Sequence, residues 1–205
     1  MTKMIDHLRR KLESVGFDIF DISVDWGNKV SIAKHFEGVD DPDLHVENYT
    51  PKILYYPNFE ENQDYHEEIG YCSCSFIDGF DASGKKADML EAADAHSVDL
   101  LYAVQPLFEE NHDLETESDL AEFGILYVHH IHIEPKYRNN GIGTAALSII
   151  MHYLAPEMGL TATIINKEEA IAKRMFDRLN FYPIKNDNKW EVWLKRSESP
   201  HFKRI

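Results

Sequence analysis

Alternation of apolar and polar residues predicts most strands of this chain, because successive side chains of a strand point to opposite faces. Residues 68–77 and 123–133 alternate over the longest stretches. Pro135 follows the second stretch and should end it, since proline donates no hydrogen bond to a sheet. Shorter strands are expected at 17–24, 29–36, 53–56 and 161–165, near Phe181, and at 190–195.

Apolar residues at intervals of three and four predict helices over 1–15, 86–110, 141–154 and 167–179. Pro106 should end or bend the second of these helices. The segments 38–51 and 57–68 collect prolines and acidic residues, so we expect loops there. No run of about 18 apolar residues occurs, and no segment is expected to span a membrane.

The net charge of the chain limits which classes of molecule it is expected to bind. The 205-residue chain has a formal net charge of -15 at pH 7. Such a field repels phosphate backbones and anionic lipid surfaces and attracts cations, although solubility alone also explains it. We expect no nucleic-acid or membrane partner, whereas a cationic amine is compatible, with Asp94, Asp99 and Glu122 as candidate contacts. Trp190 and Trp193 fit a homodimer edge as well as a core.

The two cysteines, Cys72 and Cys74, lie two residues apart in an alternating segment. Their side chains should share one face of the strand, where ordinary strand geometry disfavours a disulfide between them. The spacing fits neither a zinc knuckle nor a redox motif. Two buried, reduced cysteines are expected, which favours a cytoplasmic location.

The stretch 138–144, with the sequence RNNGIGT, follows the predicted strand 123–133 and opens the predicted helix 141–154. Gly141 and Gly143 allow the backbone to approach a ligand closely. The first turn of a helix leaves amide protons unpaired, and the helix dipole adds positive charge there. With Arg138 as a charged partner, the stretch is predicted to bind a pyrophosphate. No lysine–serine pair follows the glycines, so a nucleotide-triphosphate loop is not indicated.

This region resembles motif A of the GNAT superfamily of acyl-CoA N-acyltransferases, and a partial match to motif B follows at 172–181. The motif A positions are Ile131, Ile133, Pro135, Tyr137, Arg138, Gly141, Ile142 and Gly143. The resemblance implies an α/β (α+β) fold with a mixed, bent sheet of about six to seven strands flanked by helices. It implies one acyltransferase domain over 1–205, with 1–60 as a helix and hairpin decoration and 123–195 as the cofactor-binding half.

The same resemblance implies acetyl-CoA as the cosubstrate. The strand ending at Ile133 would splay from the strand at 161–165 and leave a cleft for the pantetheine arm. Backbone groups of Ile131 and Ile133 would pair with that arm, and one of the two amides would stabilise the oxyanion. Asn166 is either a further contact or a helix cap. The pyrophosphate would be held by residues of the turn, namely Arg138, Asn140, Gly141, Ile142, Gly143 and Thr144.

Transfer of an acetyl group to a primary amine by direct attack needs a route for the proton of the amine. The resemblance places a base at His129 or Tyr127, and His129 is preferred because imidazole titrates near neutral pH. A histidine satisfied in or beside the core is the alternative. Without a bulge, Tyr127, His129, Ile131 and Ile133 share one face of the strand.

Phe176 departs from the family pattern, which often has a tyrosine there as the acid for the departing thiolate. Tyr182 is the candidate replacement, or the thiolate leaves unassisted. Glu169 stands where an asparagine often opens motif B. These departures leave a noncatalytic acyl-CoA-binding module as a second hypothesis. The pair His130 and His132 leaves a metal-dependent hydrolase as a third.

Overall fold

The computed structural model describes residues 22–25, 46–57, 66–79, 86–109, 121, 123–155 and 159–197. Its strands are β1 Ile22–Asp25, β2 Val46–Tyr49, β3 Lys52–Tyr55, β4 Glu67–Ile77, β5 Ile125–Ile133, β6 Leu160–Asn166, β7 Tyr182–Asn186 and β8 Trp190–Arg196. Its helices are α2 Lys86–His96, α3 Val98–Val104, α5 Ile142–Leu154 and α6 Ala170–Arg178, with short 3-10 turns η4 Gln105–Leu107 and η6 Pro135–Tyr137. The helix expected at 1–15 and the strand expected at 29–36 lie outside the described residues.

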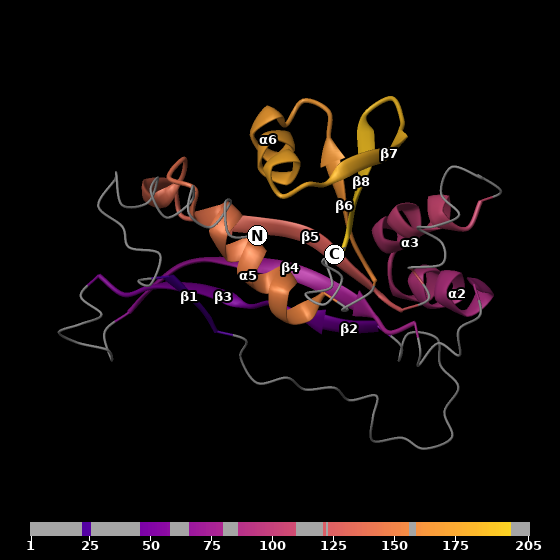
Figure 1. Ribbon diagram of the computed structural model, residues 1–205, viewed down its shortest axis with the longest axis horizontal. Coiled ribbons are helices and arrows are strands. Elements are labelled where there is room, and N and C mark those ends of the chain that lie inside the picture. Colours follow the sequence, from indigo (N-terminus) through magenta and orange to yellow (C-terminus); the bar gives the residue numbers. More distant parts are fainter. Residues whose placement is uncertain are drawn as a thin grey trace, which may run out of the picture. The chain divides into compact units, whose positions relative to one another are not determined.

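The described strands form one mixed sheet in the order β1-β3-β4-β5-β6-β8-β7, with β2 pairing to β4 (Figure 1). Strands β5 and β6 are parallel, whereas the β1–β3, β3–β4, β6–β8 and β7–β8 pairs are antiparallel. This confirms the expected mixed sheet flanked by helices. The expected strands at 53–56, 68–77, 123–133, 161–165 and 190–195 correspond to β3, β4, β5, β6 and β8.

Two expectations about elements are wrong. Residues 46–49, expected in a loop, form β2, because a short polar strand gains its hydrogen bonds from its neighbour β4 and not from its own propensity. The helix expected at 86–110 is divided into α2, α3 and η4. Ser97 separates the first two, since its hydroxyl accepts a hydrogen bond from the Leu100 amide at 3.1 Å and caps α3.

The chain divides into two compact units, the first made of residues 1–29, 49–73 and 130–153. In this unit α5 packs on strands β3, β4 and the end of β5 (Figure 1). The apolar stripe of α5 supplies the helix side of the core, since helical residues three and four apart share a face. The core consists of Ile53, Ile69, Ile133, Tyr137, Ile142, Ala145 and Ala146.

The second unit is made of residues 30–48, 74–129 and 154–205. Helices α2 and α3 pack on its strands and bury a larger core. Its buried members include Ile77, Met89, Leu100, Val104, Ile125, Tyr127, Ala162, Val192 and Leu194. Ile125 and Tyr127, in the first half of β5, therefore pack in this core, whereas Ile131 and Ile133 pack in the core of the first unit.

The cysteines follow the expectation in their burial. Cys72 and Cys74 are 0% and 1% exposed, and they form no disulfide. No helix within the described ranges combines the length and the apolar character needed to cross a bilayer.

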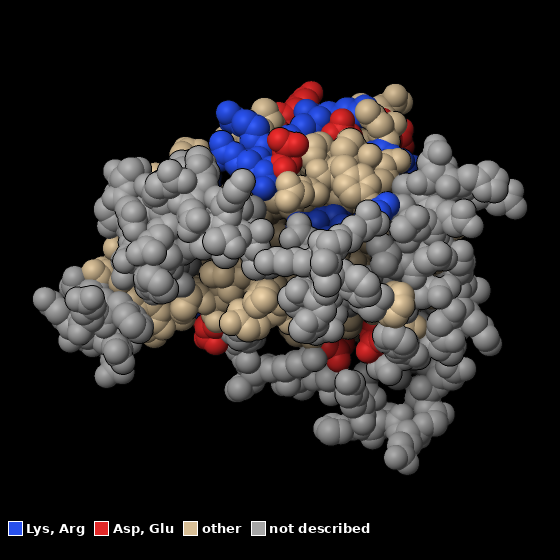
Figure 2. Space-filling model, in the orientation of Figure 1, with Lys and Arg blue, Asp and Glu red and all other residues tan. Residues whose placement is uncertain are grey.

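The negative net charge of the chain is not spread evenly. Figure 2 shows basic atoms gathered where Figure 1 places α6. This helix contributes Lys173, Arg174 and Arg178 against the single acid Asp177. The net charge of the whole chain predicts repulsion of anions, but the basic surface of α6 should attract them locally.

Gly70 packs closely against the backbone of β5. A Cβ at position 70 would lie 2.1 Å from the carbonyl oxygen of His132. Because that oxygen moves only if β5 moves, Gly70→Ala should lower the free energy of unfolding by about 1–3 kcal/mol, as overpacking does. Denaturant unfolding measures the change, and Ser73→Ala in the same strand is the control. A Gly70→Ala protein as stable as wild type would contradict the close approach.

Candidate active site

The turn after β5 leads directly into the N-terminus of α5. Asn139 and Gly141 adopt positive φ angles of 67° and 88°, a region that glycine enters without strain. The first intrahelical bond of α5 runs from the Ala145 amide to the Gly141 carbonyl at 3.0 Å. The amides of Ile142 and the two residues after it precede that bond, so they are the donors that a helix N-terminus offers to an anion. The φ angle gives a reason for glycine at 141 besides the close approach of a ligand, which stays a prediction.

Arg138 has a second role that the sequence did not predict. Its Nε donates a hydrogen bond to the carbonyl oxygen of Ile133 at 2.6 Å, which closes the turn back onto the end of β5. The side chain is exposed, and the terminal amino groups of the guanidinium are the donors that can reach an anion. Arg138 therefore braces the turn against the end of β5 with one nitrogen.

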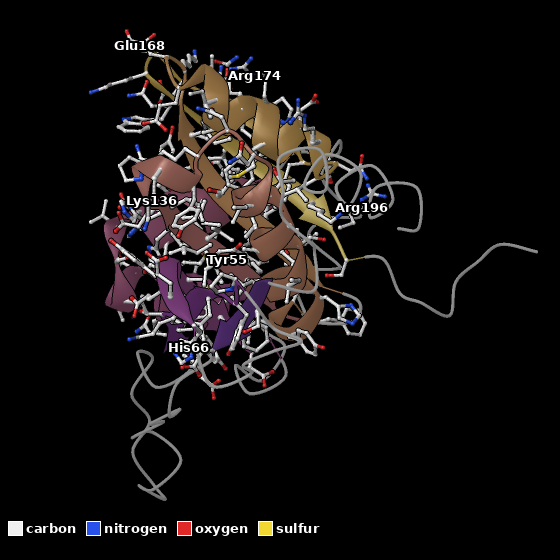
Figure 3. All side chains as sticks on the ribbon, turned by 90° about the vertical axis from the view of Figure 1, so that its left-hand side faces the viewer. Tyr55, His66, Lys136, Glu168, Arg174 and Arg196 are labelled. Carbon is white, nitrogen blue, oxygen red and sulfur yellow. The ribbon has the colours of Figure 1, made fainter. Side chains whose placement is uncertain are left out.

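A polar anchor fixes η6, the segment just before the turn, to β4. The Tyr137 hydroxyl donates a hydrogen bond to Glu67 at 2.5 Å, and Lys136 forms an ion pair with the same carboxylate. The hydrogen bond from Lys136, and then that from Tyr137, hold the pKa of Glu67 below its ordinary value. Tyr55 on β3 packs its ring 5.8 Å from that of Tyr137, and Figure 3 labels Tyr55 and Lys136.

Tyr127 is a poor candidate for the base. Its side chain is 3% exposed inside the core of the second unit. Burial raises the pKa of its hydroxyl well above the ordinary value, and the negative charge of Asp99 adds to the rise. Tyr127 therefore stays protonated at neutral pH, whereas a base must first be deprotonated.

His129 sits edge-on against Tyr127, with ring centroids 4.6 Å apart, and takes part in a group of polar side chains that we call the Ser75 cluster. The Ser75 hydroxyl lies 2.6 Å from His129 Nε2 and 2.6 Å from Asn48 Oδ1. His96 Nε2 lies 3.1 Å from the same Asn48 oxygen. Sequence reasoning missed Ser75, Asn48 and His96; a serine inside an alternating strand was the one local signal.

The remaining residues of β5 divide between the two cores. Ile131 and Ile133, expected on one face with Tyr127 and His129, pack with α5 in the first unit, whereas Tyr127 packs with α2 and α3 in the second. Strands β5 and β6 pair in parallel from Ile125 beside Leu160 to Val128 beside Thr163. Thr163 closes this stretch by donating its hydroxyl hydrogen to the Val128 carbonyl at 2.9 Å.

His130 and His132 do share a face, because both rings contact Tyr71, at centroid distances of 5.3 and 5.4 Å. Within the described part of the chain, no group of three or more His, Cys, Asp or Glu residues is placed to hold a metal ion. The third ligand that the hydrolase hypothesis needs is therefore not found among those residues.

The residues of motif B have local partners. Phe176 is 5% exposed and packs edge-on against Phe181, with centroids 5.0 Å apart. Tyr182 is half-buried beside the core of the second unit. Asn166 Oδ1 accepts a hydrogen bond from the Glu168 amide at 3.0 Å, so its oxygen stabilises the turn before α6. The N-cap residue of α6 is Glu169, so Asn166 is not the helix cap of the alternative interpretation.

Asp94 and Asp99, two of the three acids expected to attract a cation, are exposed on α2 and α3, and Glu122 lies outside the described residues. Their exposure allows contact with a cationic ligand but equally fits solvated surface acids.

The parallel β5–β6 ladder, the turn at 138–144 and the helix α5 that begins there are the parts on which the comparison with known proteins bears. Residues 55–181, more than half of the chain, match the acetyltransferase (GNAT) family. The chain belongs to this family. No curated protein matched the sequence.

Solved structures of acetyltransferases resemble the chain remotely. An acetyltransferase from Thermus thermophilus aligns over 73% of this chain and 64% of its own, at 11% identity and a TM-score of 0.41. NAA60 of Arabidopsis thaliana with a bisubstrate analogue aligns over 74% and 76%, at 13% identity and 0.43. An N-acetyltransferase, paia, from Thermoplasma acidophilum with coenzyme A aligns over 73% and 60%, at 8% identity and 0.41. The chain spans less than two thirds of the first and third, and likenesses this remote identify no substrate.

The anchor at Glu67 should make stability depend on pH. Folding lowers the pKa of this carboxyl below 4.5, so its stabilising effect is present above that value and is lost as the pH falls through the folded pKa. Glu67→Gln removes the charge. Wild type should therefore melt at a higher temperature than Glu67→Gln at pH 7, and the gap should close as the pH falls from about 5 to 3.

Thermal melts at several pH values measure this gap. Glu68→Gln is the matched control, because Glu68 is the next residue of the strand and forms an exposed ion pair with Lys52 away from the turn. A gap between wild type and Glu67→Gln that stays constant down to pH 3 would contradict a charged anchor.

Proposed function

We propose that the protein transfers an acetyl group from acetyl-CoA to a primary amine by direct attack, without a covalent enzyme intermediate. The observation that carries this proposal is the turn at 138–144, with Gly141 at positive φ and the first amides of α5 ahead of its first intrahelical bond. Family membership supports the reaction class.

The pyrophosphate of CoA fits the turn by its chemistry. Each phosphate oxygen accepts hydrogen bonds, and backbone amides at a helix N-terminus supply fixed donors with the positive end of the dipole behind them. The amides of Asn140, Gly141, Ile142, Gly143 and Thr144 are the proposed donors. Arg138 adds a charged donor whose direction is set by its bond to the Ile133 carbonyl.

The pantetheine arm is proposed to run along the end of β5. The thioester oxygen can only accept hydrogen bonds, so the amide of Ile131 or Ile133 is the group proposed to bind it. A fixed amide there would stabilise the negative charge that develops on that oxygen. The amide nitrogen of Asn166 is a further proposed contact, since its oxygen serves the turn before α6.

The reaction itself is a single displacement. The lone pair of the amine attacks the thioester carbon and forms the C–N bond, while the carbonyl π pair moves onto oxygen. The pair then returns, the C–S bond breaks and the CoA thiolate leaves. His129 accepts the proton from the amine, and the thiolate takes a proton from Tyr182 or from solvent, since Phe176 has none to give.

Thiol release tests the proposed function. With acetyl-CoA and a panel of primary amines, wild type should release free thiol in proportion to acetylated amine. His129→Ala should lower kcat/KM at neutral pH by about 100-fold or more, because a general base contributes roughly 10²–10⁴-fold. His152→Ala is the control, because His152 is an exposed histidine on α5 outside the proposed site.

Two outcomes would count against this account. CoA binding without thiol release from any amine would favour the noncatalytic module. Thiol release by His129→Ala at the wild-type rate and with the wild-type pH profile would remove His129 as the base.

A further inference from the structure

The Ser75 cluster joins three separate elements to His129 inside one unit of the protein. Ser75 lies on β4 and is 0% exposed, Asn48 comes from β2, and His96 is the last residue of α2. All four residues belong to the second unit. A buried hydroxyl needs hydrogen-bond partners, and the side chains of Asn48, His129 and His96 lie 2.6, 2.6 and 3.5 Å from it.

The chemistry of the acceptor sets the direction of the hydrogen bonds. Asn48 Oδ1 can only accept, so the Ser75 hydroxyl hydrogen, 2.6 Å away, points to it. The Ser75 oxygen then has only lone pairs to offer His129, and His129 Nε2 must donate to it across 2.6 Å. His96 Nε2 likewise donates to Asn48 Oδ1 at 3.1 Å. His96 Nε2 also lies 3.5 Å from the Ser75 oxygen, which has a second lone pair to offer it. One arrangement of protons thus satisfies all four contacts.

We infer that Ser75, oriented by Asn48, holds neutral His129 in the tautomer with its proton on Nε2, so that Nδ1 accepts the proton of the attacking amine. This inference rests on the proposed function. Ser75 and Asn48 are positioning residues, because they act through His129. When Nδ1 takes the proton, the C–N bond forms at the amine, and the positive charge on the imidazolium is shared with Ser75 through the Nε2–H bond.

The same geometry argues against Ser75 as a nucleophile. Its hydroxyl is fully buried, and its hydrogen is directed to Asn48 and not to His129. A serine that attacked a thioester would need the opposite arrangement, with histidine accepting the hydroxyl proton.

Among the residues that the structure describes, Tyr127, His96 and Asp99 are the titratable groups whose contacts lead to His129. Tyr127 lies beside it on β5 and stays neutral, since burial raises its pKa. His96 approaches through Asn48 from α2, and Asp99 on α3 acts on Tyr127. Asn48 is exposed, so a carboxylate can replace its amide without being buried. That substitution therefore places a negative charge at the oxygen that Ser75 and His96 share.

Two substitutions should move the pH dependence in opposite directions. Ser75→Ala removes the acceptor of the Nε2 proton, so the acid limb of the kcat/KM profile should move down by about half a unit to one unit while the rate falls. Asn48→Asp puts a negative charge near the imidazolium, so the same limb should move up by about one unit. Ser73→Ala, which removes a hydroxyl from the same strand, should leave the limb in place.

A direct readout of the ring accompanies the kinetics. Long-range 1H–15N spectra of the full-length protein, with His129 assigned by comparison with His129→Ala, report which nitrogen carries the proton. Wild type should show the Nε2–H tautomer at high pH, and Asn48→Asp should retain it. Ser75→Ala should show a mixture of tautomers.

The outcomes separate the inference from the proposed function. If wild type releases thiol but the Nδ1–H tautomer dominates, or neither substitution moves the acid limb, the inference is overturned and the function stands. If no amine gives thiol release, the function fails, and the base role that the inference assigns to Nδ1 falls with it. Opposite shifts with a retained Nε2–H tautomer in wild type support the inference.

Discussion

The hydrogen bond from Arg138 to the carbonyl of Ile133 is the constraint on which the proposed site depends. It joins the end of β5 to the turn, so the direction of the strand sets the direction of the first amides of α5. Tyr137 and Lys136 hold the intervening segment to Glu67 on β4. A preformed set of donors loses little entropy when an anion binds, which supports the proposal that the turn holds a charged cosubstrate.

The proposed transfer of a proton to His129 depends on which nitrogen of its ring carries a proton beforehand. A ring nitrogen accepts a proton only if the neutral tautomer leaves its lone pair there, and the tautomer is set by what the other nitrogen contacts. In this protein that contact is a buried serine, held by an asparagine at the surface. Burial of Tyr127 works in the same direction, since a tyrosine that stays protonated leaves His129 as the proposed base on this strand.

Local sequence pattern was enough to predict the strand, the turn and the helix of the proposed CoA site, because each depends on neighbouring residues. Alternation located β5, Pro135 marked its end, and Gly141 occupies the position that requires positive φ. The Ser75 cluster was not predictable, because Asn48, Ser75 and His129 come together only when β2, β4 and β5 assemble. The polar segment that forms β2 resembled a loop for the same reason, since its pairing partner lies far along the chain.

The central claim is that the turn at 138–144 binds the pyrophosphate of CoA. Calorimetric titration of wild type with CoA and with pantetheine, which carries the same arm without the phosphates, tests it most directly. Two or more charge-assisted hydrogen bonds contribute about 3 kcal/mol or more, so CoA should bind at least about 100-fold more tightly. Equal affinity for CoA and pantetheine would contradict the claim.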